Sequence, residues 1–419
     1  MTPPPLAIPP GGSPVYFSPP PQQGPSCPMC NHRCSIEGDT LPRHLRNCHT
    51  GPNGKKLIWT PVFYKEEEDK SRLIRDHSRV VEQEDLAEEV LLNAEAFSNY
   101  GFESSYIERL PEECLIEVDT LRHHYSQEGL IHSDRPKHTH LRRPVSPSFA
   151  PRAVSQLEGR IQIHVRHLLQ NAKARHGYEF DVIRDLAQPL PVTVIADVLG
   201  VPEAYRDRFP VWSASVLRFF SSPQPEPARA RELDANLVEW RNLVSDLLRS
   251  RSRSPRDDFL TTVARATENG EMSAEDGLVI CVHLLTAGHE TTTNLIGNTI
   301  YCLVTRPEQL EEARSSQRVL QDAVEETLRY EPPIARIRRL CTQSYELGGV
   351  LIREGEPVAA VVAAAHRDPE IFQRPDEFDL HRATAERGHF SFGRGPHFCL
   401  GAPLARLETM VAVGEFLDR

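Results

Sequence analysis

The chain reads as a series of helices interrupted by a few proline and glycine turns. Its longest uninterrupted stretch, residues 274–304, has no proline and is rich in apolar residues, which predicts a buried helix. A second helical run covers residues 402–416. Residues 346–362 read as short strands turned by Gly348, Gly349 and Gly355. The fold is therefore predicted to be mainly α-helical with a small β-sheet region, in the α+β class.

The amino-acid composition of the chain changes twice before this helical part begins. Residues 1–25 contain ten prolines together with glycine and serine and show no periodicity, which predicts a disordered tail. Residues 26–56 are rich in Cys and His and are expected to form a separate small segment. Residues 57–419 are predicted to form the main folded domain.

Composition narrows the function classes. The net charge of −11 argues against a nucleic-acid binder as a whole. No apolar run reaches 18 residues and the start lacks a signal-peptide pattern, so no membrane anchor is expected. Several of the nine cysteines occur singly, which suits a reducing cytoplasm.

One cysteine near the C-terminus lies among glycines, directly before the predicted helix at 402–416. Gly393, Gly395 and Gly401 permit close approaches that a Cβ atom would block, so a large flat group could lie against this loop. The Cys399 sulfur would then face that group. The thiolate is the metal-binding form of cysteine, and N–H groups at a helix start stabilise its charge. A thiolate on haem iron favours O–O cleavage, so the loop indicates a haem ligand rather than a buried structural cysteine.

The loop resembles the haem-binding signature of the cytochrome P450 family, Phe-Gly-x-Gly-x-His/Arg-x-Cys-x-Gly, and residues 392–401 match it at every fixed position. This resemblance implies a cytochrome P450 fold of the soluble bacterial type. Haem b would lie between a long distal helix and the helix that follows the cysteine loop. It also implies Cys399 as the axial ligand of the iron, and it places Phe392, Gly393 and His397 among the haem-binding residues.

The predicted helix at 274–304 contains the run Ala287-Gly288-His289-Glu290-Thr291. Gly288 costs about 1 kcal/mol of helix stability relative to alanine, so a use for the missing side chain is expected. In the family this is the distal helix, opened beside small residues where oxygen binds. The resemblance implies Glu290 as the proton-relay acid and Thr291 as the hydroxyl donor to oxygen. The alternative is a solvated helix face.

A second motif predicts a structural ion pair. Glu326 and Arg329 lie three residues apart on a helix that two prolines end, so they share a face. Such pairs are usually exposed and contribute less than about 1 kcal/mol. The family instead buries the pair and completes it with an arginine that precedes the cysteine loop. Arg374 and Arg382 both fit this position, and Arg382 is slightly better placed.

A third motif predicts an anion clamp. His138 and Arg142 are four residues apart and stack on one helix face, and a guanidinium group binds carboxylates in a bidentate manner. In the family this segment holds the haem propionates, with an arginine and a histidine that match Arg339 and His397. The alternative is a basic helix face in solvent.

The Cys/His segment at 26–56 resembles a single zinc finger. Its candidate zinc ligands are Cys27, Cys30, His44 and either Cys48 or His49. These ligand types suit tetrahedral zinc, although the central spacer has thirteen residues instead of twelve and Cys34 competes as a ligand. An unstructured leader is the alternative. One finger rarely binds DNA specifically, so docking to a partner or to the main domain is expected instead.

Together the motifs predict a haem-thiolate monooxygenase, an oxidoreductase that activates O2 with two external electrons and oxidises a small organic substrate, in secondary metabolism or xenobiotic oxidation. Because the chain has no flavin or iron–sulfur motif, the electrons are expected from a ferredoxin or flavodoxin drawn to Arg142, Arg143 and Arg406. Three alternatives are a peroxide-driven haem enzyme, a zinc-finger regulator that senses haem without turnover, and a product that holds no haem. Glu290 and Thr291 argue against the first. The fold leaves the substrate open.

The resemblance covers residues 78–419 and predicts further features. Residues 78–86 resemble the strand that leads into the family's first helices, and a polar, irregular stretch follows as far as Pro136. Residues 219–226 are expected to form a loop that covers the pocket. The family continues beyond the helix after the cysteine loop with a pocket-lining hairpin, so this C-terminal hairpin is expected to be missing here.

Overall fold

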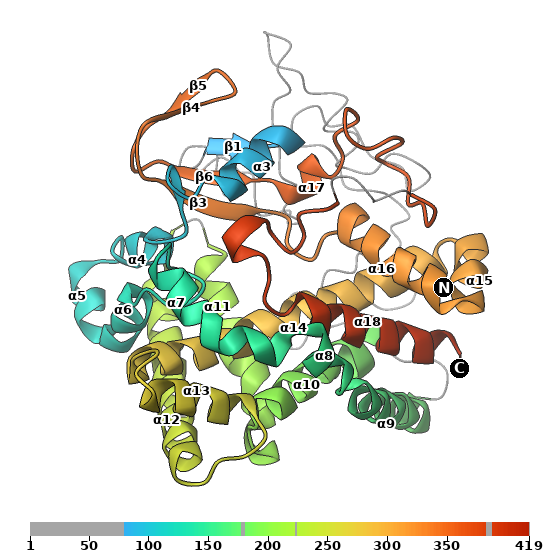
Figure 1. Ribbon diagram of the computed structural model, residues 1–419, viewed down its shortest axis with the longest axis horizontal. Coiled ribbons are helices and arrows are strands. Elements are labelled where there is room, and N and C mark those ends of the chain that lie inside the picture. Colours follow the sequence, from blue (N-terminus) through green and yellow to red (C-terminus); the bar gives the residue numbers. More distant parts are fainter. Residues whose placement is uncertain (1–78, 177–180, 223, 383–387, 419) are drawn as a thin grey trace, which may run out of the picture.

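The computed structural model describes residues 79–176, 181–222, 224–382 and 388–418. The proline-rich tail and the whole predicted zinc segment lie outside these ranges, including Cys27, Cys30, His44, Cys48 and His49. The described part is mainly helical with two small sheets, which confirms the predicted fold class (Figure 1). Within it, no helix is both long enough and apolar enough to span a lipid bilayer.

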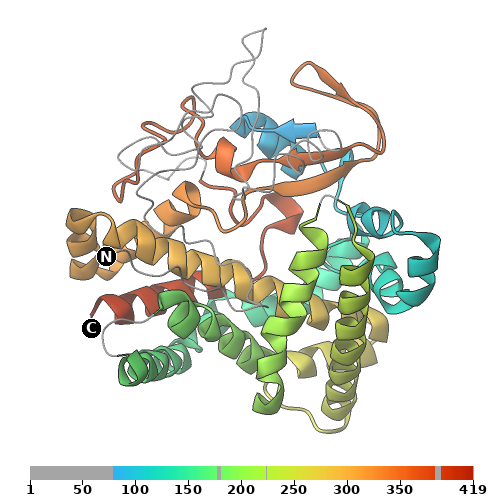
Figure 2. The same ribbon diagram turned by 180° about the vertical axis from the view of Figure 1, so that it is seen from behind.

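Helix α14 (Ala274–Val304) passes through the middle of the helical body, as Figures 1 and 2 show from opposite sides. It begins with a capping box, because the Ser273 hydroxyl accepts the Asp276 N–H while the Asp276 carboxylate accepts the Ser273 N–H. Its four main packing partners are α10 (Pro189–Leu199), α12 (Pro227–Arg253), α16 (Gln317–Tyr330) and α18 (Ala402–Leu417). The predicted bounds of the long helix match the observed ones.

The remaining helices surround this centre. They are α3 (Glu84–Leu92), α4 (Phe102–Ile107), α5 (Glu112–Glu117), α6 (Asp119–Ser126), α7 (Lys137–Val145), α8 (Pro151–Ser155), α9 (Glu158–His176), α11 (Phe209–Phe220), α13 (Phe259–Glu268), α15 (Pro307–Ser315) and α17 (Val362–Ala365). Short 3-10 or π turns are η1 (Ser146–Phe149), η2 (Ile183–Ala187), η3 (Glu203–Arg208) and η4 (Gly395–His397).

The main sheet joins distant parts of the chain. Its strand order is β1-β6-β3-β2, with β1 (Arg79–Val81) parallel to β6 (Pro357–Ala360) and β3 (Ile337–Cys341) antiparallel to both β6 and β2 (Phe97–Ser98). A separate hairpin consists of β4 (Tyr345–Leu347) and β5 (Val350–Ile352). Gly348 and Gly349 turn this hairpin at φ of 55° and 76°, a region that favours glycine.

Residues 86–136 are not irregular, which corrects the sequence-based expectation. They contain the three short helices α4, α5 and α6, and each of these buries apolar side chains such as Ile107, Cys114 and Leu121. The Leu121 N–H donates to the Asp234 carboxylate on α12, 2.7 Å away, so α6 is fastened to the helical body. Helices this short draw their stability from tertiary packing, which a polar sequence conceals.

Candidate active site

The cysteine loop lies between the main sheet and α18 (Figure 1). Gly393 and Gly395 adopt φ of 72° and 64°, and a Cβ atom at residue 395 would approach the Leu92 side chain to 3.0 Å. The Cys399 N–H donates to the Phe392 carbonyl oxygen at 2.8 Å and closes the loop. Glycine is therefore required where the loop passes α3, and the closed loop fixes the cysteine directly before α18.

The Cys399 sulfur is surrounded by protein and also open to solvent. Burial, the largest effect, raises the pKa of its thiol, whereas the N–H groups of Gly401 and Ala402 and the positive charges of Arg142 and Arg406 lower it. The N–H groups at the start of α18 are oriented to stabilise a thiolate there, as a metal ligand requires.

Helix α14 also borders an open space at one turn. Ala287 is exposed although it lies in the middle of this otherwise mostly buried helix. The Thr291 hydroxyl donates to the Ala287 carbonyl at 2.9 Å. Burial raises the pKa of Glu290 to about 7, and the charge of Arg218 opposes this rise. The turn thus presents a small side chain, a hydroxyl and a carboxyl that is close to half protonated at neutral pH.

The expected opening of this helix is absent, because α14 is continuously helical from residue 274 to residue 304. A Cβ atom at Gly288 would meet Ile195 at 3.5 Å, an ordinary van der Waals distance. Packing against Ile195 therefore does not require glycine at this position.

Two histidines face one another beside the cysteine loop. The ring centroids of His138, on α7, and His397 are 4.0 Å apart. Burial lowers the pKa of His138 and lowers that of His397 to about 3, so both rings are neutral. The Nε2 atom of His138 is buried and has no hydrogen-bond partner within the described ranges. Nearly all buried polar atoms in proteins have hydrogen-bond partners, so this nitrogen is available to bind a ligand.

Two arginines lie close to the same histidines, since both Arg142 and Arg339 depress the pKa of His397 by their charge. Arg142 donates hydrogen bonds to the carbonyl oxygens of Pro396 and Phe398 at 3.2 and 2.6 Å. Arg339, on β3, is 5% exposed and donates to the Arg338 carbonyl at 2.8 Å.

Neither guanidinium group hydrogen-bonds a carboxylate in the described parts of the chain. With the unpartnered His138 nitrogen, this donor set fits a group that carries two carboxylates, as the porphyrin of haem does. The residues present therefore fit haem.

The Glu326–Arg329 pair is buried, with side chains 1% and 0% exposed. Arg329 donates through Nη2 and Nε to the two carboxylate oxygens of Glu326 at 2.7 and 2.9 Å. The Arg382 Nε atom donates to the same carboxylate at 3.0 Å. Arg374 lies elsewhere, paired at the surface with Glu377 and Asp379.

Two further residues fix the cysteine loop and were not found by sequence reasoning. His366, fully buried, bonds the Arg329 carbonyl through Nδ1 at 3.1 Å and accepts the Phe390 N–H at Nε2 at 2.6 Å. Glu325 accepts bonds from Arg406 and from the His389 ring. Burial would raise the pKa of Glu325, but its hydrogen bonds and electrostatic interactions with Arg406 and His389 outweigh this effect and lower the pKa to about 2.

Arg406, near the start of α18, is therefore paired with Glu325. Of the three arginines expected to attract a redox partner, only Arg143 is exposed.

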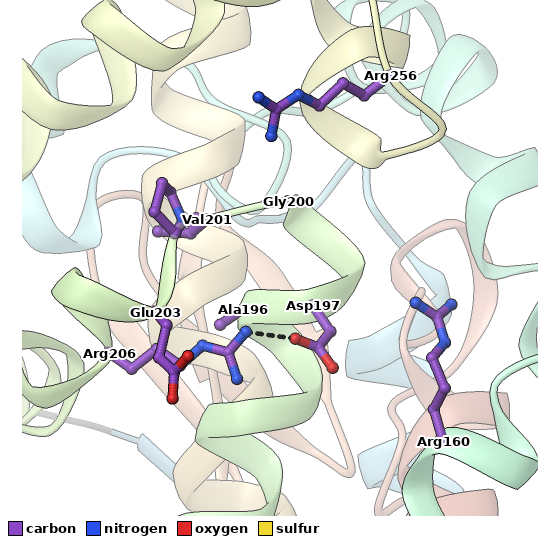
Figure 3. A pocket seen from close by; sticks show the side chains of 9 residues that line it. Arg160, Ala196, Asp197, Gly200, Val201, Glu203, Arg206 and Arg256 are labelled. Carbon is purple, nitrogen blue, oxygen red and sulfur yellow. Dashed lines mark hydrogen bonds and ion pairs between the residues drawn. The ribbon is translucent and has the colours of Figure 1, made fainter.

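A separate hollow of about 330 Å³ opens beside α10, and Figure 3 shows its lining. Arg206 and Asp197 form an ion pair of 2.5 Å across it. The hollow includes none of the predicted site residues. It is distinct from the cysteine loop and from the exposed turn of α14.

Known proteins share this arrangement. Residues 90–419 match the profile of the family described as Cytochrome P450. Cytochrome P450 107B1 of Saccharopolyspora erythraea is 41% identical over 69% of this chain and 69% of its own length. The cytochrome P450 monooxygenase PikC of Streptomyces venezuelae is 40% identical over 70% of this chain and 68% of its own.

Solved structures are similar as well. One is P450BioI in complex with an acyl carrier protein ligated to hexadec-9Z-enoic acid. It superimposes with a TM-score of 0.72 and 33% identity, covering 81% of this chain and 84% of that one. The extent of the family match, the identity to these relatives and the shared fold lead to one conclusion: the chain belongs to the cytochrome P450 family of haem-thiolate monooxygenases.

Proposed function

We propose that Cys399 is the axial ligand of the haem iron in this monooxygenase. The observation that carries the proposal is the exposed Cys399 side chain, whose sulfur accepts hydrogen bonds from the N–H groups of Gly401 and Ala402 at the start of α18. We further propose that the space in front of Cys399 and the one beside Ala287 are one cavity, with Phe392 and Gly393 against the porphyrin. Haem, when bound, would supply the activation of O2.

The test is the absorption spectrum of the haem-loaded, reduced protein under carbon monoxide. A strongly red-shifted Soret band, which reports thiolate ligation, is expected. A Soret band at the position given by a neutral ligand, or no uptake of haem, would contradict the proposal.

The propionates would be held by His138, Arg142, Arg339 and His397. Support comes from the two arginines, neither of which hydrogen-bonds a carboxylate in the described chain, and from the unpartnered His138 nitrogen. Hydrogen bonds to charged groups contribute about 1.5–3 kcal/mol each. The clamp would therefore fix both the affinity for haem and its orientation over the cysteine loop.

Substituting Arg142→Gln should weaken haem binding about tenfold to a hundredfold, because one charge-assisted contact is lost. The rate of haem transfer to an excess of a scavenger protein measures this. Arg143→Gln, at the exposed neighbour on the same helix, is the matched control and should leave the rate unchanged. Equal rates for both variants would count against the clamp.

Protons would reach the reacting oxygen from the exposed turn of α14. With a pKa of about 7, the Glu290 carboxyl can both hold and release a proton at neutral pH. The Thr291 hydroxyl, which donates to the Ala287 carbonyl, can rotate to donate toward the cavity instead. We propose that Glu290 supplies the proton and that Thr291 orients it.

Glu290→Gln should lower product formation about a hundredfold, the usual contribution of a positioned acid.

The same substitution should also change how the stability of the protein depends on pH. Burial raises the pKa of Glu290 from 4.5 to about 7, so its contribution is complete below pH 4.5 and is lost as the pH rises through 7. The decline in urea unfolding curves should be smaller in the variant but not absent, because burial also raises the pKa of Glu331 and Glu408. Glu308→Gln, at an exposed position on α15, should leave the decline unchanged. A decline of the same size in Glu290→Gln and in the unmodified protein would refute the assignment.

We propose that electrons come from a ferredoxin or flavodoxin and that the substrate is a small organic molecule of secondary metabolism or a xenobiotic. Support for the substrate class comes from similar proteins that are named as a 6-deoxyerythronolide B hydroxylase and an erythromycin C-12 hydroxylase. Support for an acidic donor comes from the exposed Arg143. The four buried free cysteines favour a cytoplasmic location. Turnover should require ferredoxin, its reductase and NADPH; equal turnover with peroxide alone would favour the peroxide-driven alternative.

We also propose that residues 26–56 bind one zinc ion through Cys27, Cys30, His44 and either Cys48 or His49. Support comes from the ligand types and their spacing in the sequence. The purified protein should contain about one equivalent of zinc, and Cys27→Ser should remove it. Zinc content that is zero, or that is unchanged by the substitution, would end the hypothesis.

A further inference from the structure

Three histidines from separate segments meet beside the central helix. His124 lies on α6, His132 lies between α6 and α7, and His283 lies on α14. The ring centroid of His283 is 4.9 Å from that of His124 and 4.9 Å from that of His132, both edge to face. No sequence motif joins these residues, so only the fold brings them together.

The cluster is buried, and most of its ring nitrogens lack hydrogen-bond partners within the described chain. His124 and His283 are 1% and 6% exposed. Four ring nitrogens have no hydrogen-bond partner within the described chain, namely His124 Nε2, His132 Nδ1 and both nitrogens of His283. Each such atom costs about 1–3 kcal/mol, so four in one place are exceptional. Within the described chain, no group of three or more Cys, His, Asp or Glu side chains is placed to hold a metal ion, and this includes the three histidines.

The neighbours of the cluster assign its donors and acceptors. The Arg241 Nη1 atom donates to His124 Nδ1 at 3.0 Å, so the proton of this ring is on Nε2, which is a donor. His132 Nε2 faces the Glu103 carboxylate at 3.6 Å, which favours the tautomer with its proton on Nε2 and Nδ1 as the acceptor. Burial lowers the pKa of His124 to about 3 and lowers the pKa of His283 well below 6.5. The cluster therefore offers a donor, an acceptor and a neutral His283 that can be either.

The position of the cluster relates it to the active site. His283 lies one helical turn before the exposed Ala287 on α14. His132 lies close enough to His397 in the cysteine loop for the two rings to interact electrostatically. The Tyr125 ring packs beside the cluster. Its centroid is 6.1 Å from that of His283 and 4.9 Å from that of Phe220, which lies at the end of α11. The three imidazoles thus lie between the cysteine loop and the α11–α12 connection.

We propose that this cluster is a subsite of the substrate pocket that recognises an uncharged hydroxyl group. A hydroxyl donates one hydrogen bond and accepts others, so it can satisfy His124 Nε2, His132 Nδ1 and one nitrogen of His283 together. A carboxylate can only accept, and an ether cannot donate. The rings of Tyr125 and Phe220 would pack against the apolar part of the same molecule. The inference rests on the proposed function, because it assumes that the cavity beside Ala287 receives the substrate.

The test compares three probes on the haem-loaded protein: 1-dodecanol, its methyl ether and dodecanoate. Binding is measured by titration calorimetry and by the shift of the Soret band. The alcohol should bind at least about tenfold more tightly than either other probe, a difference of about 1.4 kcal/mol. In His283→Phe the alcohol should bind about as tightly as the other two probes do. His123→Ala, at the half-exposed neighbour of His124 on α6, should retain it.

A second variant, His124→Phe, guards against misfolding of the first, and it should also lose the preference. The reduced carbon monoxide spectrum of each variant separates the two hypotheses. A thiolate-type spectrum with no preference for the alcohol in the unmodified protein overturns the subsite and leaves the proposed function intact. Failure of all probes to bind, or a preference that survives both substitutions, also overturns it.

Discussion

Replacing Cys399 with serine is expected to abolish the thiolate-type spectrum of the reduced carbon monoxide complex and to lower turnover at least about a thousandfold. That loss corresponds to about 4 kcal/mol in the activation barrier. A serine hydroxyl does not ionise at neutral pH, so the N–H groups of Gly401 and Ala402 would stabilise no anion. The electron donation that favours O–O cleavage would then be missing.

The matched control is Cys341→Ala, because Cys341 is also a free cysteine and lies on β3 away from the loop. Its spectrum and turnover should equal those of the unmodified protein. Spectra of both variants and product formation with a reconstituted electron supply measure the effect. Retention of the thiolate band in Cys399→Ser, or its loss in Cys341→Ala, would indicate that a cysteine other than Cys399 is the ligand.

Truncating Glu326 to alanine is expected to destabilise the protein by about 3–5 kcal/mol, the usual cost of removing one partner from a buried ion pair. Arg329 would remain fully buried with its charge uncompensated, and Arg382 would lose the carboxylate that it also contacts. Because α16 supports the cysteine loop, the variant should also lose haem at lower urea concentration than the unmodified protein does.

Arg374→Ala provides the comparison. Arg374 pairs with Glu377 and Asp379, but its side chain is 61% exposed, so its loss should cost less than about 1 kcal/mol. Urea unfolding followed by circular dichroism and by haem absorbance measures both variants. Similar destabilisation of the two would mean that burial of the Glu326–Arg329 pair does not govern stability here.

Features encoded by local pattern could be predicted from the sequence. The bounds of α14 follow from an apolar run that begins at a serine cap, and the buried Glu326–Arg329 pair follows from spacing and from its resemblance to the family. The loop around Cys399 was recognisable because its glycines are tied to backbone conformations that other residues rarely adopt.

Features that depend on contacts between distant parts of the chain could not be predicted from the sequence. His366 acts by bonding main-chain groups of residues 329 and 390, which no spacing rule connects to it. Helices α4 to α6 look irregular because each buries only a few side chains. The continuity of α14 at Gly288 was also missed, since a glycine alone does not reveal whether a helix opens.

The contacts of Arg329 have a consequence for how this protein can diverge. Besides Glu326, the guanidinium group bonds the main-chain oxygens of His366, Pro375 and Glu377, at 2.8 to 2.9 Å. A carbonyl is present whatever the side chain, so the identities of residues 375 and 377 are free to drift while the scaffold under the cysteine loop keeps its shape. Insertions or deletions between residues 366 and 377 lack that freedom, because they would displace the oxygens themselves.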